Sequence, residues 1–337
     1  MQKYVATVGG GVASLRLTEA KAAKVGPGEV RVQVEAVSLN RRDLMILEGG
    51  YPVAPGDFVP VSDGAGIVTE VGPGVTWKVG DRVVASFFPD WHFGDPRSDT
   101  TARSLGTGSL GMLASEVVLP ANGLVRAPTH LSAEQAATLP CAGVTAWHAL
   151  FEVGALKRDG WVLLQGTGGV SIFGLQLARA AGYRAVITSS SDEKLARARS
   201  LGASATVNYR TSEDWADDVA TLTGGVDRVI EVGGSGTLEG SVRAARPGAR
   251  IAIIGGLTGF EGGVSALDLI FRSLHLDGIL IGSRSMLEDL SRFLEATGIE
   301  PVVDQVFPFA RAADAFRTFG ENEHFGKIVV TLNPGKP

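Results

Sequence analysis

Residues 161–185 read WVLLQGTGGVSIFGLQLARAAGYRA, and this stretch decides the fold of the chain around it. It begins with an apolar run at 161–164, which is typical of a strand buried on both faces. Glycines stand at positions 166, 168 and 169, and an apolar-periodic segment then runs from 170 to 181, before Gly182. Together with the apolar run at 185–188, this pattern predicts a strand, a glycine turn, a helix and a second strand, which form a βαβ unit.

The glycines in this unit suit the binding of a pyrophosphate. Gly166 permits a tight turn, and Gly168 lets the backbone approach a phosphate where a Cβ would collide. The helix that starts at Gly169 and Val170 offers free N–H groups and the positive end of its dipole to an anion. Ser171 replaces the third glycine of the strict G-x-G-x-x-G pattern, and its hydroxyl can also face the phosphate. An ordinary strand–helix turn would share the glycines, but the flanking elements favour a dinucleotide site.

Composition limits the class of protein. The 337 residues are enough for two domains, and 45% hydrophobic with 20% charged residues is typical of a globular protein. A net charge of -5 gives no basic patch for nucleic acid, and no 18-residue apolar run or apolar signal core is present. The single cysteine, Cys141, excludes an intrachain disulfide and a cysteine-rich zinc module. We therefore expect a cytoplasmic protein that binds neither nucleic acid nor a membrane.

The pattern of the chain changes near residue 129. Before it, short strand-like runs such as 29–37, 59–72 and 79–85 alternate with glycine turns and predict a barrel or sandwich-like β domain, while 89–111 predicts a long loop. After it, helices alternate with strands, which predicts a doubly wound parallel sheet. The expected helices are 132–139, 145–153, 192–201, 212–223, 238–245 and 312–319, and the expected strands are 205–207, 227–232, 250–254, 279–281 and 327–332.

Three motifs together resemble the medium-chain dehydrogenase/reductase superfamily: Gly-Asp-Arg-Val at 80–83, GTGGVS at 166–171 and HFGKIVV at 324–330. The resemblance covers essentially the whole chain. It implies a GroES-like β-barrel catalytic domain formed by 1–128 and 285–337, a Rossmann dinucleotide-binding domain at 129–284, and an active site in the cleft. The segment LPCAGVTAWHAL at 139–150 resembles the family segment that lines the nicotinamide end.

The zinc-dependent members of this superfamily carry a catalytic Cys, His, Cys set and a four-cysteine structural loop, and this sequence departs from both. The three aligned ligand positions hold Asn40, Ser62 and Cys141. A catalytic zinc takes about three protein ligands, which one thiol cannot supply. We interpret the nearby His92 as a polar loop residue and expect no zinc. The remaining resemblance is to the zinc-free branch, which includes quinone oxidoreductases, enoyl and alkenal reductases and zinc-independent alcohol dehydrogenases.

The resemblance to quinone reductases implies that Asn40 and Tyr51 are the catalytic candidates, because polar groups near the nicotinamide stand at these positions. Tyr51 could donate to the substrate oxygen or simply pack at a turn, and Asn40 could bind substrate or ribose or only cap a turn. Ser62, Trp91 and Cys141 are candidates for the substrate pocket, although Trp91 and Cys141 could equally be packed core residues.

The choice of cofactor depends on the end of the second strand of the βαβ unit. NAD sites place an acid there, about 20 residues past the fingerprint, to bind the ribose 2′-hydroxyl. This sequence has Ser189 and Ser190 instead, and with Lys194 they could bind a 2′-phosphate. Tyr209 matches a position where quinone reductases add phosphate contacts, and the acids at 192–193 could cap the next helix. We predict NADP(H) over NAD(H), with NAD(H) possible.

The other candidate cofactor residues occupy family segments that line the cleft. Each candidate has a purely structural alternative: Thr145 could cap a helix, the three glycines could simply form turns, and Arg41 and Lys327 could be exposed to solvent without binding anything. These candidates are Arg41, Thr145, Gly233, Gly255, Gly256, Phe325 and Lys327.

Our leading functional hypothesis is an NADPH-dependent reductase of quinones, enones or enals that works without zinc. Hydride transfer to a simple ketone leaves an alkoxide that needs a Lewis acid or strong proton donor, whereas a conjugated carbonyl delocalises the charge. The alternatives are a zinc-independent alcohol dehydrogenase or carbonyl reductase, and a non-enzymatic NADPH-binding protein like the crystallin relatives of this family. The apolar segment 276–282 resembles the edge strand through which family members pair, so we expect a homodimer.

Overall fold

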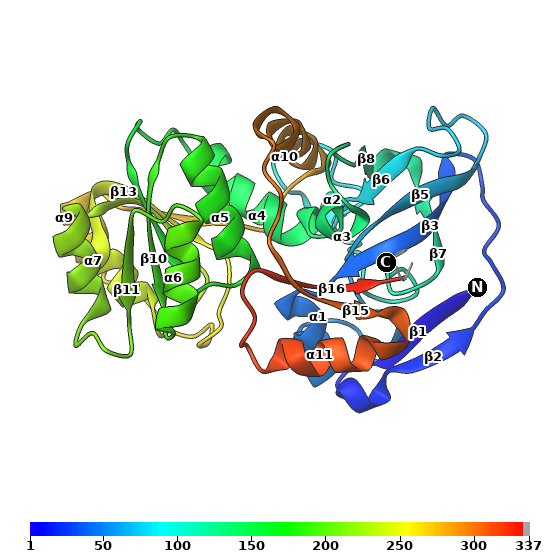
Figure 1. Ribbon diagram of the computed structural model, residues 1–337, viewed down its shortest axis with the longest axis horizontal. Helices are drawn as coiled ribbons and strands as arrows, with labels where there is room; N and C mark the ends of the chain where they lie inside the picture. Colours follow the sequence, from blue (N-terminus) through cyan, green and yellow to red (C-terminus); the bar gives the residue numbers. More distant parts are fainter. Residues whose placement is uncertain (333–337) are drawn as a thin grey trace. The chain divides into compact units, whose positions relative to one another are not determined.

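The computed structural model describes residues 1–332, which form two compact units (Figure 1). Among the described residues, unit 1 comprises 1–144 and 282–332, and unit 2 comprises Thr145–Ile281. Unit 1 is therefore built from both ends of the chain, whereas unit 2 is one continuous segment. The domain boundaries expected from the sequence, at 128 and 285, stay a prediction.

A seven-stranded sheet forms the body of unit 1, with strand order β15-β16-β3-β5-β6-β8 and β7 paired to β3. The C-terminal strand β16 pairs antiparallel with β3, so the last strand of the chain completes a sheet that the N-terminal region begins. A smaller sheet has the order β2-β1-β4. The strands are β1 Gln2–Thr7, β2 Arg16–Glu19, β3 Glu29–Ser38, β4 Asp57–Phe58, β5 Asp63–Val71, β6 Arg82–Ala85, β7 Glu116–Pro120, β8 Leu124–Arg126, β15 Val303–Pro308 and β16 Lys327–Thr331.

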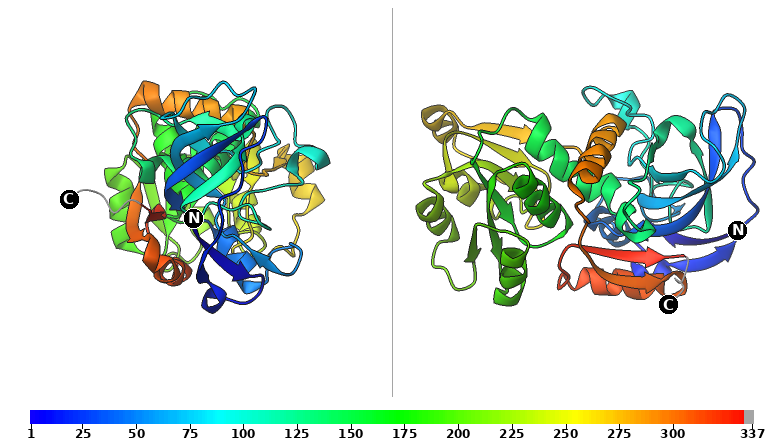
Figure 2. Two further views of the ribbon diagram at one scale, coloured as in Figure 1. Left: turned by 90° about the vertical axis from the view of Figure 1, so that its right-hand side faces the viewer. Right: turned by 45° about the horizontal axis from the view of Figure 1, so that its top comes forward.

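The core of unit 1 is formed by strands in which buried apolar residues alternate with more exposed ones. Val30, Val32 and Val34 of β3 are buried between more exposed neighbours, as the sequence pattern predicts. Helix α11 packs along β15 and β16 (Figures 1 and 2). The helices are α1 Arg41–Glu48, α2 Ser98–Thr101, α3 Ala133–Ala136, α10 Arg284–Thr297 and α11 Ala312–Gly320, with α4 Val144–Trp147 at the boundary between the units.

Unit 2 is built on a six-stranded parallel sheet with the order β11-β10-β9-β12-β13-β14. Its first strand, β9, is buried along its whole length, as expected from the apolar run. Because the chain passes from β9 to β10 on one side and returns to β12 on the other, the strand order reverses at β9. The strands are β9 Trp161–Gln165, β10 Arg184–Ser189, β11 Ala205–Asn208, β12 Val226–Glu231, β13 Ala245–Ile253 and β14 His275–Gly278. The helices are α5 Gly169–Ala180, α6 Asp192–Ser200, α7 Trp215–Thr223, α8 Leu238–Ala244 and α9 Ala266–Arg272.

Three expected elements differ from the structure. The strand predicted at 279–281 is wrong, because β14 ends at Gly278 and Ile281 has a positive φ of 51° that takes the chain out of the sheet. The helix predicted from 212 begins only at Trp215, since the Asp214 side chain accepts hydrogen bonds from the N–H groups of the first turn. The helix predicted over 145–153 is the short α4 followed by a wide helical turn at His148–Glu152.

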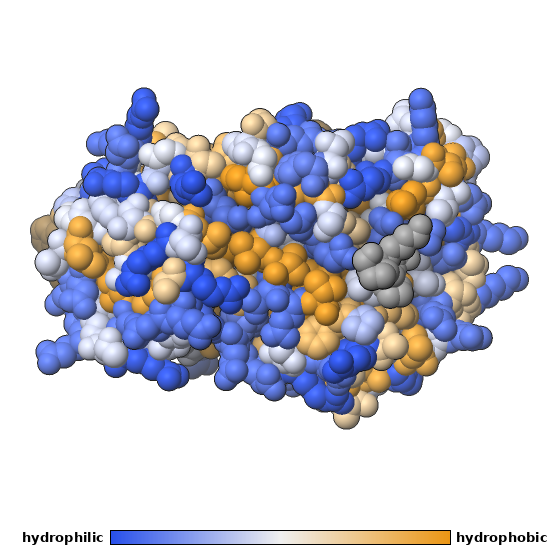
Figure 3. All heavy atoms as spheres, viewed as in Figure 1, coloured by the Kyte–Doolittle hydropathy of each residue, from blue (hydrophilic) through white to orange (hydrophobic). Residues whose placement is uncertain are grey.

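The apolar side chains are gathered inside the units. Each unit has its own cluster of buried hydrophobic residues. Hydrophilic side chains cover most of the face shown in Figure 3. Among the described residues, no helix has both the length and the apolar character needed to cross a membrane. The predicted cytoplasmic location stays a prediction.

Candidate functional site

The glycine turn after β9 leaves open space beside its backbone. Gly166 has a φ of 67°, which glycine adopts readily, and Gly168 precedes the first residue of α5. A Cβ built on either glycine would meet no atom within 4 Å. Within the described part of the chain no side chain caps the N-terminus of α5, so its first N–H groups stay available to an anion. This geometry fits a dinucleotide phosphate beside Gly169 and Val170.

Ser171 has a different role from the one expected of it. Its hydroxyl donates a hydrogen bond to the carbonyl oxygen of Gln165 at 2.6 Å, and the residue is buried. Our expectation that this hydroxyl can face the phosphate is therefore wrong. Ser171 instead ties the first turn of α5 to the end of β9.

The serines at the end of β10 lie beside the start of α6. Ser189 is buried, and its Oγ accepts a hydrogen bond from the N–H of Ser191 at 3.3 Å. Ser191 is the N-cap of α6 and accepts from the Lys194 N–H, which leaves the half-buried Ser190 between them. Asp192, in the first turn, accepts a hydrogen bond from the Asn208 amide at 2.8 Å. Tyr209 follows β11 and is half-exposed.

The glycine turns after β12 and β13 are joined by hydrogen bonds. The Thr258 N–H donates to the carbonyl oxygen of Gly233 at 2.7 Å, and the Ser235 N–H donates to that of Gly259 at 3.0 Å. Gly255 and Gly256 begin the second of these turns. The structure thus places Gly233, Gly255 and Gly256 in one interlocked pair of loops at the carboxyl end of the parallel sheet.

Thr145, another candidate cofactor residue, is buried at the start of unit 2. Within residues 1–332 its hydroxyl oxygen has no hydrogen-bond partner. Buried hydroxyls without a partner are uncommon, because leaving one unsatisfied costs free energy. Thr145 therefore has hydrogen-bonding capacity left for a ligand.

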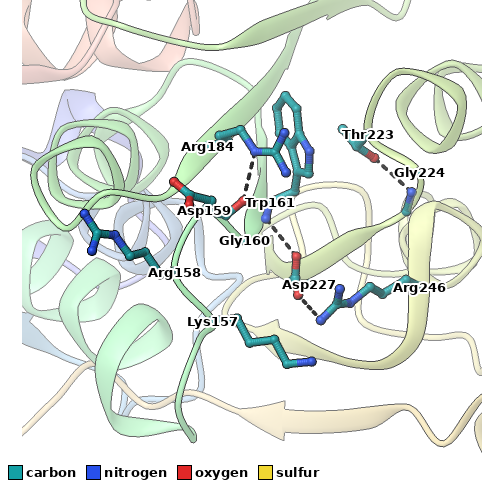
Figure 4. A pocket seen from close by; sticks show the side chains of 11 residues that line it. Lys157, Arg158, Asp159, Gly160, Trp161, Arg184, Thr223, Gly224, Asp227 and Arg246 are labelled. Atoms are coloured by element: carbon teal, nitrogen blue, oxygen red, sulfur yellow. Dashed lines mark hydrogen bonds and ion pairs between the residues drawn. The ribbon is translucent and has the colours of Figure 1, made fainter.

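A hollow of about 260 Å³ lies at the opposite, amino end of the same sheet (Figure 4). Asp227 is at its centre, where it accepts a hydrogen bond from the Trp161 N–H at 2.8 Å and pairs with Arg246. Open parallel sheets bind nucleotides outside the carboxyl ends of their strands. This hollow is therefore distinct from the candidate cofactor site.

Unit 1 contains a group of polar side chains, all buried except the half-buried Cys141, which we call the polar cluster. Its members come from the end of β3, from α1, from the start of β5, from the helical turn Leu139–Gly143 and from the first residue of β16. Segments far apart in the sequence thus meet inside one unit. The members are Asn40, Asp43, Ser62, Asp63, Cys141 and Lys327.

Lys327 is the cation of the polar cluster. Its ammonium group donates to the carbonyl oxygen of Leu39 and to Oδ1 of Asn40, the latter at 2.5 Å. Only 3% of Lys327 is exposed, so our alternative interpretation of this residue as solvated is wrong. The NH2 group of Asn40 is its donor, and this group faces the carbonyl oxygen of Ser38 at 3.5 Å and the Asp63 carboxylate.

Asp63 links the other members of the polar cluster. Its carboxylate accepts from the Ser62 hydroxyl at 2.8 Å and from the Cys141 N–H at 3.0 Å. Burial raises the pKa of Asp63 to about 6, against the opposing effect of Lys327. Burial, together with the Asp63 carboxylate, raises the pKa of the Cys141 thiol well above its usual value. Cys141 therefore stays a protonated thiol at neutral pH.

Asp43 and Lys327 carry the remaining opposite charges. Asp43 accepts a hydrogen bond from the Asn40 N–H at 2.9 Å. Burial raises the pKa of Asp43 and Arg42 opposes the rise, while burial lowers the pKa of Lys327 and Asp63 opposes that fall. The carboxylates of Asp43 and Asp63 and the ammonium of Lys327 thus stabilise each other's charged forms, which burial disfavours.

Other predicted site residues in unit 1 pack around this region. The Tyr51 ring lies 5.4 Å from the Arg42 guanidinium carbon, and Arg41 is half-buried at the start of α1. Trp91 is fully buried, with its indole N–H donating to the Gly94 carbonyl oxygen at 2.9 Å, so its place in a substrate pocket stays a prediction. Phe325 is buried just before the polar cluster's lysine.

Comparison with known proteins identifies the fold. Residues 26–129 match the alcohol dehydrogenase GroES-like domain, and residues 169–296 match the zinc-binding dehydrogenase family. A zinc-type alcohol dehydrogenase-like protein of Schizosaccharomyces pombe is 43% identical over 321 residues, covering 92% of each chain. The chain belongs to the medium-chain dehydrogenase/reductase superfamily. The predicted family and fold class, a GroES-like domain with a Rossmann domain, are confirmed, and the chain is an alcohol dehydrogenase-like member.

Other members of the superfamily differ in cofactor and substrate. A solved NAD-dependent alcohol dehydrogenase has a TM-score of 0.90 and 35% identity, covering 99% of this chain and 100% of its own. A mycobacterial protein solved with NADPH has a TM-score of 0.82 and 26% identity, covering 98% of this chain and 99% of its own. A 2-haloacrylate reductase from a Burkholderia species is 29% identical over 335 residues, which cover 93% of each chain.

The polar cluster does not fit a zinc ion. The three positions aligned with zinc ligands in the superfamily, Asn40, Ser62 and Cys141, do come together, but they offer an amide, a hydroxyl and a single thiol, which are too few zinc ligands for a catalytic site. The ammonium of Lys327 is bonded to the first of them, and a second cation would be repelled there. In the described part of the chain, no three His, Cys, Asp or Glu side chains form a group that could hold a metal.

Sequence reasoning missed several residues that shape these sites. Asp43 and Asp63 were not among the predicted site residues, although both are fully buried in the polar cluster. Glu231 and Gln165, at the ends of β12 and β9, are also buried and hydrogen-bonded to each other at 2.7 Å. For Gln165 and Glu231 the available signal was a polar or charged residue at the end of an apolar strand, where the adjacent backbone turns need hydrogen-bond partners.

Proposed function

We propose that this protein is a nicotinamide-dependent reductase of conjugated carbonyl compounds, such as quinones, enones or enals, and that it works without zinc. The observation that carries the proposal is the polar cluster, in which the position aligned with the first zinc ligand of the superfamily holds the amide of Asn40, and the ammonium group of Lys327 is bonded to that amide. A hydrogen-bond donor suits a substrate whose developing charge is delocalised. Similarity to a 2-haloacrylate reductase supports a conjugated substrate.

The residues of unit 2 would hold the cofactor, which supplies a hydride when bound. The open space beside Gly166 and Gly168 and the free N–H groups of α5 fit its pyrophosphate. The unpartnered hydroxyl of Thr145 can donate to another polar group of the cofactor. NADPH and NAD in the solved relatives support a nicotinamide cofactor in general.

Asn40 in unit 1 would act on the substrate oxygen. Lys327 holds the Asn40 side-chain oxygen, so the NH2 group is oriented as a donor, and the substrate oxygen would replace one of its present acceptors, the Ser38 carbonyl oxygen or the Asp63 carboxylate. Such preorganised donors stabilise developing negative charge without reorganisation during the reaction. Tyr51 would be a second donor, because its hydroxyl makes no hydrogen bond within residues 1–332.

The substrate class can be tested with purified enzyme and three reactions: reduction of a quinone, reduction of an enone and oxidation of a primary alcohol. We expect turnover of the first two, unchanged by a chelator, and a loss of about 100-fold in kcat/KM for Asn40→Ala. Asn122→Ala, at an exposed position of unit 1, is the matched control. Preferred alcohol oxidation would instead support the zinc-independent alcohol dehydrogenase, which the names of the relatives favour. Activity that a chelator removes and zinc restores would contradict the proposal.

We also expect NADPH to bind more tightly than NADH, because serines rather than an acid follow β10. An added carboxylate at this place repels a 2′-phosphate. Ser190→Asp is therefore expected to lower the preference for NADPH over NADH by about tenfold, with Ser204→Asp, on the exposed surface before β11, as the control. Calorimetric titration with each cofactor measures this ratio. Tighter binding of NADH by the unmodified protein would contradict the prediction, and the NAD-dependent relative makes that comparison essential.

The exposed apolar residues near β14 support the predicted homodimer. Strand β14 lies at one edge of the six-stranded sheet, and Ile270 and Phe271 of the preceding helix α9 are 69% and 82% exposed. We expect light scattering to give about twice the 35.1 kDa chain mass. Phe271→Glu should shift the mass toward the monomer, whereas Phe93→Glu, at an equally exposed position of unit 1, should not. A monomeric unmodified protein would rule out the dimer.

A further inference from the structure

Glu231, the last residue of β12, is a fully buried carboxylate that is bound by hydrogen-bond donors. Its Oε1 accepts from the N–H groups of Gly233 and Gly234, at 2.8 and 3.0 Å, and from the Thr237 hydroxyl at 2.6 Å. Its Oε2 accepts from the Gln165 amide at 2.7 Å and from the Ser241 hydroxyl. In residues 1–332 no lysine or arginine pairs with it. The charge is thus balanced only by five oriented donors.

The five donors come from three different elements. Gln165 ends β9, Gly233 and Gly234 form the turn after β12, and Thr237 and Ser241 belong to the start of α8. The other end of the Gln165 amide is also fixed, because its oxygen accepts from the N–H groups of Val232 and Gly233 at 3.2 and 3.3 Å. One carboxylate therefore connects two strands, a glycine turn and a helix.

The turn that Glu231 holds is tightly packed and leaves little freedom. A Cβ on Gly233 would lie 2.1 Å from the Thr237 hydroxyl oxygen, and one on Gly234 would lie 2.2 Å from the Gly259 carbonyl oxygen. Gly234 also has a φ of 85°. Through Thr258, which donates to Gly233, the same turn positions the loop after β13. Glu231 thereby fixes both loops that contain the candidate cofactor glycines 233, 255 and 256.

The location of Glu231 gives this network a function. It lies at the carboxyl ends of β9 and β12, where the strand order of the sheet reverses and where nucleotides bind in open α/β sheets. We propose that Glu231 is a positioning residue for the dinucleotide cofactor: its carboxylate holds the two glycine loops in the shape that receives the cofactor. This inference rests on the proposed nicotinamide dependence and assigns the residue that organises that part of the site.

Asp227, at the amino end of the same strand, provides a matched control. It is also a buried carboxylate that bridges β12 to β9, through the Trp161 N–H, but it faces the hollow at the far end of the sheet (Figure 4). Glu231→Gln and Asp227→Asn each replace a buried acceptor oxygen with an amide NH2 of nearly the same size. Both variants should lower the melting temperature, because in each the new amide NH2 group faces hydrogen-bond donors that the carboxylate had accepted from.

Cofactor affinity separates a positioning role from a structural one. We expect Glu231→Gln to raise the dissociation constant for NADPH, measured by fluorescence titration, about tenfold. Its KM for NADPH should rise by a similar factor while kcat changes less, and Asp227→Asn should leave the dissociation constant within about twofold. Equal effects of both variants on affinity, or an unchanged affinity in Glu231→Gln, would overturn the proposal. Failure of the unmodified protein to bind either nicotinamide nucleotide would instead overturn the cofactor proposal itself.

Thr237→Val keeps the experiment decisive if Glu231→Gln does not fold. This variant removes one donor to Glu231 and retains the branched shape of the side chain. The residue is only half-buried, so folding should tolerate the change. We expect a rise of about threefold to tenfold in the NADPH dissociation constant. No rise in a folded Thr237→Val protein would contradict the role assigned to the network.

Discussion

Replacing Lys327 with methionine is expected to lower the free energy of unfolding by about 3–5 kcal/mol, the usual cost of removing one partner from a buried group of charges. Methionine fills nearly the same volume, so the loss should come from the charge. Without the ammonium, the buried carboxylates Asp43 and Asp63 have no lysine to oppose their charge, and Asn40 loses the partner of its side-chain oxygen. Denaturant unfolding at pH 7 measures the change.

Two further variants show whether the lost positive charge causes the destabilisation of Lys327→Met. Lys24→Met removes an exposed lysine of unit 1 and should change stability by no more than about 0.5 kcal/mol. Adding Asp63→Asn to Lys327→Met should recover part of the loss, because one unpaired carboxylate is then removed. If Lys327→Met costs no more than Lys24→Met, or if the two cluster changes simply add, Lys327 does not balance the carboxylates.

The second large effect is a dependence of stability on pH through Asp63. Burial raises its pKa from 3.8 to about 6, so between these values the native protein holds a proton that the unfolded chain has released. Stability contributed by Asp63 is therefore fully present below pH 4 and is lost as the pH rises through 6. Because one pKa unit corresponds to about 1.4 kcal/mol, the loss is about 3 kcal/mol.

Comparison with the Asp63→Asn variant isolates the part of the pH dependence of stability that comes from Asp63. The asparagine keeps a neutral side chain at all pH values, so its stability minus that of the unmodified protein should grow by about 3 kcal/mol from pH 4 to pH 7. A constant cost of placing the asparagine NH2 opposite the Ser62 hydroxyl or the Cys141 N–H cancels in this difference. Asp95→Asn, at an exposed position, is the control for the substitution itself. A flat profile for Asp63→Asn would show that Asp63 ionises normally in the folded protein.

The βαβ unit could be predicted from the sequence because every signal in it is local. The apolar run of β9, the glycines at 166 and 168 and the periodicity of α5 lie within a short stretch and agree with one another. The helix α10, Arg284–Thr297, was not predicted although it is strongly amphipathic, because our sequence interpretation treated the chain after 285 as a return to the β domain. The strand β14 was placed too late because the apolar residues 279–281 outweighed the more mixed His275–Gly278.

The polar cluster could be predicted only in part. The alignment of Asn40, Ser62 and Cys141 with zinc-ligand positions indicated that these residues meet, and the structure brings them into one group. The position of Lys327 could not be predicted, since lysine is usually exposed and its bond to Asn40 joins residues 287 apart in the chain. Contacts over such separations depend on how the sheet closes, which local patterns do not specify.

The discontinuous construction of unit 1 has a consequence for the order in which the protein matures during translation. Unit 2 is complete once residue 281 has left the ribosome, and domains generally fold as units while synthesis proceeds. Unit 1 is complete only after β16 has been synthesised, because β16 pairs with β3 and carries Lys327, whose ammonium group opposes the charges of the buried carboxylates. A nascent chain that stalls before residue 327 would therefore carry a finished nucleotide-binding half and an open, charge-unbalanced barrel, the form that quality-control proteases would be expected to remove.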